Sequence, residues 1–560
     1  MNPFDGTAVP ALSTVEFERL FPRLTPAQIA RLAVHGRRRA TADGDVLMEV
    51  AQYDVPFFVV VSGALEIVRP STGADTIIVT AQAGQFSGET NMLTGRRSLV
   101  RIRVSEPGEV IELSRDQLLA IIQTDAELSE ILMRAFIHRR VSLIARGLGD
   151  VVLIGSMHCS STLRIKEFLT RNGHPHAFVD LDRDPDAQQL LDTFHITLED
   201  VPVLICRGDA VLRNPSNHDI AECLGFNVGI DHSHVRDVVV IGAGPAGLAA
   251  AVYGASEGLD VLVIESHAPG GQAGSSSRIE NYLGFPAGIS GQELAGRAYT
   301  QAQKFGAQIA IAQVATELTC AGTPYRVRVD EDSYVSARTV IIASGAEYRR
   351  PMIENLSNFE GAGVYYGATA MEAQVCSGED VIVVGGGNSA GQAAVFLAQT
   401  TSRVFVLVRG AGLADTMSRY LIRRIEDNPR IVLCPHAEIS AMAGGGHLEQ
   451  VTWRNRRDNT EETRAIRHVF MMTGALPNTR WLNGCVALDD KGFIKTGTDL
   501  SADELSAAEW PLSRAPYLLE TSRPGVFAVG DVRGRNIKRV ASAVGEGSIA
   551  VAFVHQVLSE

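Results

Sequence analysis

The 560-residue sequence contains no Cys-x-x-Cys motif, although it has seven cysteines spread along its length. This absence argues against a zinc ribbon and against a disulfide framework, both of which depend on closely spaced cysteines. We therefore expect no metal site, and we expect most of the cysteines to be buried free thiols.

The sequence also lacks a long apolar run and an excess of basic residues. Its longest apolar stretch, at residues 57–61, is far shorter than the ~20 residues that a membrane helix needs. No signal-peptide pattern is visible at residues 1–10. The net charge of −13 argues against nucleic-acid binding, which needs a basic face to neutralise phosphates. We expect a cytoplasmic protein that neither spans a membrane nor binds nucleic acid.

The pattern of apolar residues divides the chain into several domains. Residues 1–147 contain short strands separated by glycines and polar turns, followed by a helical run at 115–146, which is typical of an all-β barrel or sandwich with flanking helices. Residues 148–230 instead alternate strands and helices, with a helix predicted at 188–194. Pro202 lies near the start of a predicted strand and is a candidate for a cis peptide bond.

A glycine-rich loop follows the buried strand at residues 237–241 and precedes an alanine-rich helix. In this loop, residues 242–247, the first glycine permits a tight turn, the second lets the backbone approach a diphosphate, and the third lets helix and strand pack closely. The next strand ends in Glu265, where a carboxylate can accept hydrogen bonds from ribose hydroxyls. The pattern predicts a dinucleotide-binding site.

A second unit of the same kind begins with the strand at residues 381–384. Its next strand ends in Arg409, where the first unit has Glu265, and a guanidinium suits a 2′-phosphate. We predict NADPH here, although a surface role for Arg409 would leave either nicotinamide cofactor open. The predicted residues of this site are Gly385, Gly387, Asn388, Ser389, Ala390 and Arg409.

The part of the chain from residue 236 onward resembles the low-molecular-weight thioredoxin reductases of the pyridine nucleotide-disulfide oxidoreductase family. Besides the two glycine loops, the motifs on which this resemblance rests lie at residues 270–273, 280–282, 343–346, 473–474, 530–532, 538–541 and 545–547. The resemblance implies two Rossmann-like α/β domains, an FAD-binding domain at 236–350 and 474–560 split by an NAD(P)H-binding domain at 351–473, and a homodimer. The expected FAD-binding residues are Gly242, Gly244, Pro245, Ala246, Gly247, Glu265, Gly270, Gly271, Gln272, Asn281, Gly345, Gly530, Asp531, Arg539 and Val540.

The redox-active cysteine pair of these reductases is absent. The family has Cys-Ala-Thr-Cys in the NADPH domain, whereas this chain has Gly367, Ala368, Thr369 and Ala370. Because neither glycine nor alanine can exchange thiol for disulfide, we expect an NADPH-dependent FAD oxidoreductase with a different electron acceptor. A quinone, oxygen, a ferredoxin-like protein and a separate thiol protein all remain open. The nearby Cys376 has no partner in the sequence.

Residues 148–230 resemble a thioredoxin or glutaredoxin domain. Cys159 follows the first strand and precedes a helix, where a redox thiol would lie, but Thr162 occupies the position of the resolving cysteine. Cys159 is therefore a candidate catalytic residue as a monothiol only, for example in disulfide reduction with an external thiol. The alternative is a domain retained for docking or packing.

Residues 15–146 resemble a cyclic nucleotide-binding domain with a jelly-roll fold. In that family a Gly-Glu pair holds the ribose and a downstream arginine pairs with the cyclic phosphate. Gly88 and Glu89 fit the pair, but Ser98 stands at the arginine position and Arg97 lies one place early. Two functions remain open for this domain: a sensor that responds to a cyclic nucleotide or to redox state, and a degenerate jelly roll that serves regulation or oligomer contacts.

Overall fold

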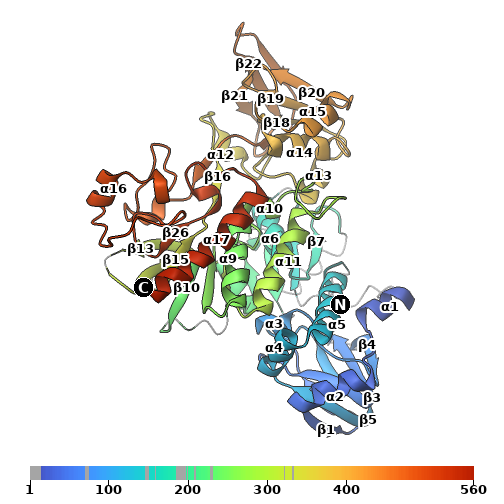
Figure 1. Cartoon of the computed structure of the whole chain (residues 1–560). Helices are drawn as coiled ribbons and strands as arrows, with labels where there is room; N and C mark the ends of the chain where they lie inside the picture. Colours follow the sequence, from blue (N-terminus) through green and yellow to red (C-terminus); the bar gives the residue numbers. More distant parts are fainter. Residues whose placement is uncertain are drawn as a thin grey trace. The chain divides into compact units, whose positions relative to one another are not determined.

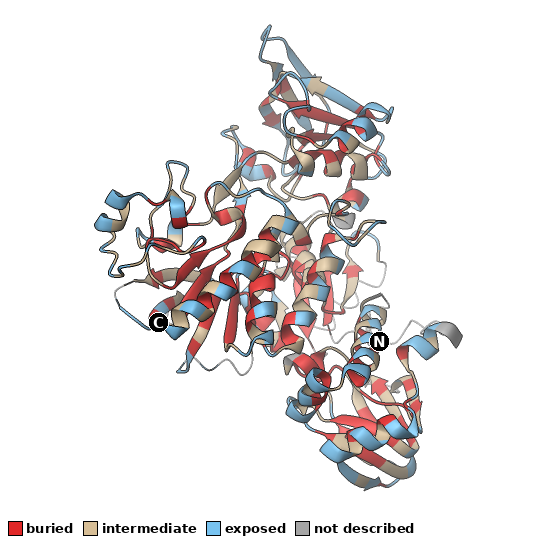
Figure 2. Ribbon diagram, viewed as in Figure 1, coloured by how far each residue is buried: buried red, intermediate tan, exposed pale blue. Residues whose placement is uncertain are grey.

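The structure is a computed structural model that describes residues 14–69, 75–145, 151–157, 159–184, 197, 200–206, 210–227, 231, 233–320, 322–330 and 333–560. The chain forms two compact units. The first comprises Met1–Ser156, Ile165–Ile230 and Thr300–Ala312, and the second comprises Met157–Arg164, Asp231–Tyr299 and Gln313–Glu560. Figure 1 labels the helices and strands, and Figure 2 shows that buried residues concentrate along the strands of the sheets.

The N-terminal segment folds into a five-stranded antiparallel sheet with the order β1-β5-β3-β4, in which β2 also pairs with β5. The sequence pattern indicates separate strands at 57–61 and 64–68, but the structure has one long strand, which passes through Gly63 with φ of 78° and shifts register against β5 there. The strands are β1 (Arg37–Thr41), β2 (Val46–Met48), β3 (Phe57–Arg69), β4 (Thr76–Gln82) and β5 (Arg101–Leu113).

Helices flank this sheet, as the sequence predicts. The helical run at 115–146 is two helices, because Asp125 adopts an extended conformation between α4 and α5. From α5, Phe136 packs edge-on against Phe57 and Phe86 of the apolar core. α5 therefore forms one wall of the jelly-roll interior. The helices are α1 (Thr14–Leu20), α2 (Pro26–His35), α3 (Asn91–Thr94), α4 (Arg115–Thr124) and α5 (Ala126–Ala145).

The second segment contains a four-stranded sheet with the order β7-β6-β8-β9. β6 is parallel to β7 and antiparallel to β8, and β9 is antiparallel to β8. The Val201–Pro202 peptide bond is cis, as the sequence suggests. The helix predicted at 188–194 lies outside the described residues. The elements are β6 (Val151–Gly155), α6 (Ser160–Arg171), β7 (Ala177–Asp180), β8 (Val203–Cys206), β9 (Ala210–Arg213) and α8 (Asn217–Leu224).

The first glycine loop belongs to a sheet in which β10 lies between the parallel strands β11 and β15. β15 also pairs in parallel with β26, which comes much later in the chain. The strands are β10 (Val235–Ile241), β11 (Val261–Glu265), β12 (Gln308–Ile311), β13 (Ala315–Thr319), β14 (Tyr325–Val329), β15 (Ser333–Ile342) and β26 (Val526–Ala528). The accompanying helices are α9 (Pro245–Ser256), α10 (Gly271–Gly274), α11 (Gly291–Lys304), α16 (Ala502–Ala507) and α17 (Val540–Ser559). Three 3-10 turns lie in the same part: η2 (Arg480–Leu482), η3 (Gly497–Asp499) and η4 (Gly530–Val532).

The second glycine loop belongs to a separate parallel sheet with the order β17-β24-β18-β19-β20. Its strands are β17 (Val364–Tyr365), β18 (Asp380–Val384), β19 (Arg403–Val408), β20 (Ile431–Pro435) and β24 (His468–Met471). Helices α12 (Leu356–Phe359), α13 (Ala370–Val375), α14 (Asn388–Leu397) and α15 (Arg419–Glu426) accompany it. Two smaller sheets complete the fold: β21 (Ala437–Ala443), β22 (Gln450–Asn455) and β23 (Glu461–Arg464), and the pair β16 (Ala346–Tyr348) and β25 (Ala475–Pro477).

One described helix, α17, is long and apolar enough to cross a membrane by length and composition alone. It packs against α9 so closely that a Cβ atom at Gly547 would collide with the carbonyl oxygen of Ala246. Such close packing is typical of a helix that covers a sheet in a folded domain.

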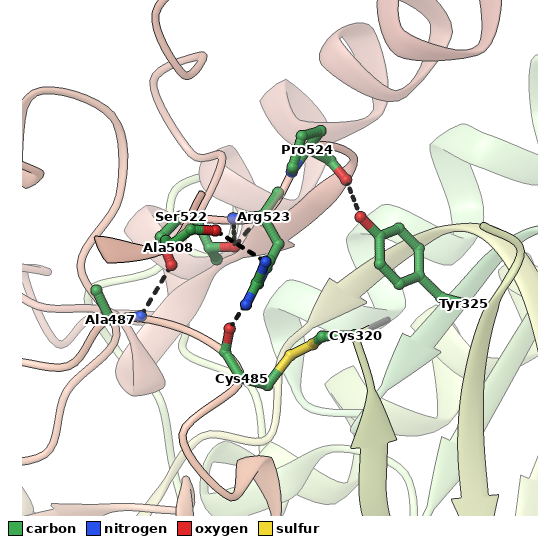
Figure 3. The surroundings of a disulfide bond; sticks show 9 residues. Cys320, Tyr325, Cys485, Ala487, Ala508, Ser522, Arg523 and Pro524 are labelled. Carbon is green, nitrogen blue, oxygen red and sulfur yellow. Dashed lines mark hydrogen bonds between the residues drawn. A yellow bond between two sulfur atoms is a disulfide. The ribbon is translucent and has the colours of Figure 1, made fainter. Parts of the chain in front are cut away.

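The prediction that most of the cysteines are free thiols is confirmed, since five of the seven are free, although only Cys206 and Cys376 are buried. Cys320, just after β13, forms a disulfide with Cys485, which lies 165 residues later (Figure 3). The side chain of Arg523 holds the Cys485 loop in place, donating from Nε to the Cys485 carbonyl at 3.1 Å. Spacing along the sequence cannot reveal such a bridge, because only the fold brings the two residues together.

Candidate dinucleotide and thiol sites

The first glycine loop joins β10 to α9 in a conformation that only glycine tolerates. Gly242 has φ of 102°, and its N–H donates to the Ile264 carbonyl at 2.8 Å. A Cβ atom at Gly247 would collide with the carbonyl oxygen of Gly242. Gly244 precedes α9 and has no side chain to cap it, so the N–H groups of the first turn are left for a ligand. The loop therefore fits the diphosphate of a dinucleotide.

Glu265 lies at the end of β11 beside this loop and is 7% exposed. One carboxylate oxygen accepts from the Ala243 N–H at 2.7 Å, and the other accepts from the His267 N–H at 2.9 Å. These two bonds fix the carboxylate, while each oxygen retains capacity to accept another hydrogen bond. The geometry fits an acceptor for ribose hydroxyls.

The α10 loop is tied to the first glycine loop. The Gly270 N–H donates to the Ala243 carbonyl at 2.7 Å, and the Gln272 side chain donates to the Ala346 carbonyl. The loops on which FAD was expected therefore lie together. The other predicted residues of this region lie at the start of α9, in α10 or on adjoining loops: Pro245, Ala246, Gly271, Asn281 and Gly345.

The 3-10 turn η4 carries the carboxylate of Asp531. The Gly530 N–H donates to Glu546 of α17 at 2.7 Å. No described residue donates a hydrogen bond to the Asp531 carboxylate, whose pKa is raised by burial and lowered in part by Lys538. A half-buried carboxylate without a donor fits a ligand that supplies hydroxyl groups, such as the ribityl chain of FAD. The two remaining predicted residues form the start of α17: Arg539 and Val540.

The second glycine loop has the same form at the start of α14. Gly385 has φ of 143°, and a Cβ atom there would collide with the Met472 carbonyl. Gly387 precedes the helix without a side-chain cap, and the Asn388 side chain accepts from the Ser418 N–H at 2.7 Å. Ser389 and Ala390 follow in the first turn. This loop also fits a diphosphate.

Arg409 directly follows β19 and is exposed. Among the described residues, no carboxylate forms an ion pair with it, in contrast to Arg403 at the other end of the strand, which pairs with Asp380. A free guanidinium at this position fits the 2′-phosphate of NADPH.

The cyclic nucleotide candidates of the N-terminal domain do not all face one cavity. Gly88, Glu89 and Ser98 line a cavity inside the jelly roll. Arg97 is not among the lining residues: it is 1% exposed and donates to the Cys223 carbonyl at 2.8 Å. Sequence reasoning missed Arg139 of α5, which does line the cavity and donates to the Gly88 carbonyl at 2.6 Å.

Residues 236–547 match the family described as pyridine nucleotide-disulphide oxidoreductase. The chain belongs to this family. Residues 38–125 match the cyclic nucleotide-binding domain family, which confirms the assignment of the N-terminal domain. The predicted family and the predicted cofactors, FAD and NADPH, agree with the first match and with the geometry of the two loops. The protein is an FAD-dependent NAD(P)H oxidoreductase of the thioredoxin reductase-like type.

The similar proteins and the similar solved structure are thioredoxin reductases. The chain is 31% identical to a thioredoxin reductase of Bacillus subtilis over 327 residues, which cover 58% of this chain and 96% of the relative. It is 33% identical to the thioredoxin reductase of Treponema pallidum over 316 residues, 56% of this chain and 94% of the relative. The crystal structure of Lactococcus lactis thioredoxin reductase matches with a TM-score of 0.52 and 25% identity, covering 58% of this chain and 99% of that one.

In the reductase-like part, the positions at which the resemblance predicts the redox-active cysteines carry no thiol. Of the two positions at which the resemblance predicts the family's cysteines, Gly367 lies between β17 and α13, and Ala370 is the first residue of α13. Cys376 is fully buried, and burial raises the pKa of its thiol to about 12. Burial also raises the pKa of Cys434 to about 11. Because the thiolate is the reactive form, neither cysteine suits disulfide exchange at neutral pH.

Cys159 immediately precedes α6, as the sequence predicts, and is a half-exposed free thiol. Its carbonyl accepts from the Leu163 N–H at 3.1 Å, so it stands at the helix start. Thr162, at the position of a resolving cysteine, is fully buried. Cys159 therefore has no cysteine partner within its own turn.

Proposed function

We propose that this protein oxidises NADPH through FAD and passes the electrons to an acceptor other than a disulfide in its own NADPH domain. The observation that carries the proposal is the pair Gly367 and Ala370, which stand where the family has its two cysteines. The raised pKa values of Cys376 and Cys434 support it, since they leave no reactive substitute thiol in residues 351–473.

FAD, when bound, supplies hydride acceptance from the nicotinamide and one- or two-electron transfer onward. The protein would hold FAD and NADPH in position. Glu265 and Asp531 offer carboxylate acceptors for hydroxyl groups, the start of α9 offers N–H donors for the diphosphate, and Arg409 offers a cation for the 2′-phosphate. No side-chain acid or base is required for hydride transfer, so we assign none.

We further propose the domain boundaries expected from the sequence: 1–147, 148–230, 236–350 with 474–560, and 351–473. The parallel pairing of β15 with β26, on either side of the β17–β20 sheet in the sequence, supports a split FAD domain. The β7-β6-β8-β9 order and the position of Cys159 support a thioredoxin-like second domain. A homodimer and a cytoplasmic location remain proposals based on the family resemblance and on composition.

Restoring the missing cysteines tests the proposal most sharply. In the double variant Gly367→Cys with Ala370→Cys, we expect NADPH-dependent reduction of thioredoxin to appear, whereas the wild type reduces its flavin with NADPH but not thioredoxin. The matched control is Gly367→Ser with Ala370→Ser, which adds similar volume without a thiol. Flavin that stays oxidised under anaerobic NADPH, or a wild type that already reduces thioredoxin, would overturn the proposal.

Identification of the acceptor requires a screen against the NADPH-reduced protein. Quinones, oxygen, a ferredoxin-like protein and a thiol protein are the classes to compare. The acceptor is the compound that reoxidises the flavin at a rate sufficient for steady turnover.

A second candidate function is disulfide reduction through Cys159 with an external thiol. The half-exposed thiol at the start of α6 favours it. Cys159→Ser should then abolish reduction of disulfides such as glutathione disulfide, while Cys434→Ser should leave it unchanged. Unchanged activity in Cys159→Ser would remove this candidate.

A third candidate is a sensor in which the N-terminal domain binds a cyclic nucleotide and alters flavin reduction. The match of residues 38–125 to the cyclic nucleotide-binding domain favours it. Calorimetric titration with cyclic AMP and cyclic GMP tests it, and the absence of binding by both would exclude this version.

A further inference from the structure

The jelly roll contains a partly open cavity of about 100 Å³. Its wall is mostly apolar, with side chains from the loop before β3, from β2, β3, β4 and β5, and from the loop that precedes β5. Representative wall residues are Met48, Val55, Ile67, Ile78, Leu99 and Ile102. Such a wall favours an apolar ligand, and since the cavity is smaller than the engineered apolar cavities of roughly 150 Å³ that hold benzene, it suits a slender chain.

Three neutral polar side chains of the wall are engaged with the protein backbone, whereas a fourth, Ser142, has no hydrogen-bond partner among the described residues. The Ser87 hydroxyl accepts from the Phe58 N–H at 2.9 Å. The Ser98 hydroxyl donates to the Val100 carbonyl at 2.6 Å, and the Asn91 side chain donates to the Arg97 carbonyl at 3.1 Å. These bonds use part of the capacity that the three groups could offer to the ribose, base and phosphate of a nucleotide.

One cation in the wall has capacity for a ligand. Arg139 is 7% exposed; its Nε donates to the Leu20 carbonyl at 2.8 Å and its Nη1 to the Gly88 carbonyl at 2.6 Å. Its Nη2 is buried and has no hydrogen-bond partner among the described residues. Burial lowers the pKa of Arg139 to about 9, with Glu89 opposing the shift, so the guanidinium is charged at neutral pH.

Glu89 does not neutralise this charge by direct contact. Its carboxylate accepts instead from Arg140 Nη1 at 3.4 Å. A buried donor without an acceptor is costly, and a charged one more so. Because Arg139 lines the cavity, an anion that reached Nη2 from there would satisfy it and lower that cost.

We propose that the jelly-roll cavity binds a small aliphatic carboxylate, whose carboxylate accepts a hydrogen bond from Arg139 Nη2 and whose chain lies against the apolar wall. The anchor then lies on α5 and not in the 88–98 loop, where Arg97 is engaged with the Cys223 carbonyl. This site is separate from the two dinucleotide sites and does not depend on the proposed electron acceptor.

Hexanoate is the first probe, titrated into the full-length protein by isothermal calorimetry. We expect hexanoate to bind, with hexanol and hexylammonium at least about tenfold weaker because neither supplies an anion to the guanidinium, a factor equivalent to about 1.4 kcal/mol. Arg139→Met should weaken hexanoate by a similar factor.

A pair of neighbouring residues on β4 gives a control that does not disturb Arg139. Ile78 lines the cavity, whereas Ile77 is 47% exposed. We expect Ile78→Phe to reduce hexanoate binding by filling the cavity, and Ile77→Phe to leave it unchanged.

Three results would overturn the proposal: no binding of any carboxylate from butanoate to octanoate, equal binding in wild type and Ile78→Phe, or displacement of hexanoate by cyclic AMP at lower concentration than by octanoate. Flavin reduction is not a readout here, so failure of this proposal is distinguishable from failure of the proposed oxidoreductase function.

Discussion

Replacing Cys320 and Cys485 together by serine removes the bridge that closes a loop of 165 residues in the FAD-binding part of the chain. For a loop of this length, the chain-entropy relation gives about 17 cal/mol/K, or about 5 kcal/mol at 25 °C, as the stabilisation from restricting the unfolded state. Measured effects of native disulfides are usually about 2–5 kcal/mol. We therefore expect the double variant to lose about 2–5 kcal/mol of unfolding free energy.

Urea unfolding followed by FAD fluorescence measures this loss, because free flavin fluoresces when the domain opens. The wild type in reducing buffer should unfold at the same urea concentration as the double variant, and the variant should not respond to the reductant. Cys434→Ser serves as the control for loss of a thiol. A variant that unfolds with the wild type in oxidising buffer would refute the reasoning.

Three further predictions concern the substitution of single residues. Gly247→Ala places a methyl group against the Gly242 carbonyl and should yield protein without FAD; retention of full FAD absorbance would contradict the predicted fit. Arg409→Ala should raise KM for NADPH roughly 10- to 100-fold, the loss of one charge-assisted bond, and leave KM for NADH unchanged, whereas Arg403→Ala should alter neither. Arg97→Ala should accelerate amide hydrogen exchange at the end of α8, and unchanged exchange there would show that the bond to the Cys223 carbonyl is unimportant.

The parts of the site that the sequence predicts are those whose partners are close along the chain. A strand, a glycine loop and a helix follow one another from residue 235 to 256 and again from 380 to 397. Turn sterics and helix geometry determine such units locally, so the spacing of Gly242, Gly247 and Glu265 is sufficient to indicate them.

The parts that the sequence did not reveal depend on contacts between distant segments. Cys320 meets Cys485, and Arg97 meets the Cys223 carbonyl 126 residues away. Arg139 meets the Gly88 carbonyl across 51 residues. The packing of whole helices and sheets creates these pairs, and the spacing of residues along the sequence does not indicate them. The continuity of β3 through Gly63 likewise depends on pairing with β5.

Anaerobic titration of the FAD-loaded protein with NADPH tests most directly whether the electrons stop at the flavin. A reductase with an active disulfide in its NADPH domain consumes NADPH beyond the amount needed to reduce FAD, because the disulfide also takes two electrons. With Gly367 and Ala370 in the cysteine positions, we expect flavin absorbance to bleach completely at about one NADPH per FAD, since each transfers a hydride equivalent. An end point near two NADPH per FAD, with new free thiols, would contradict this expectation.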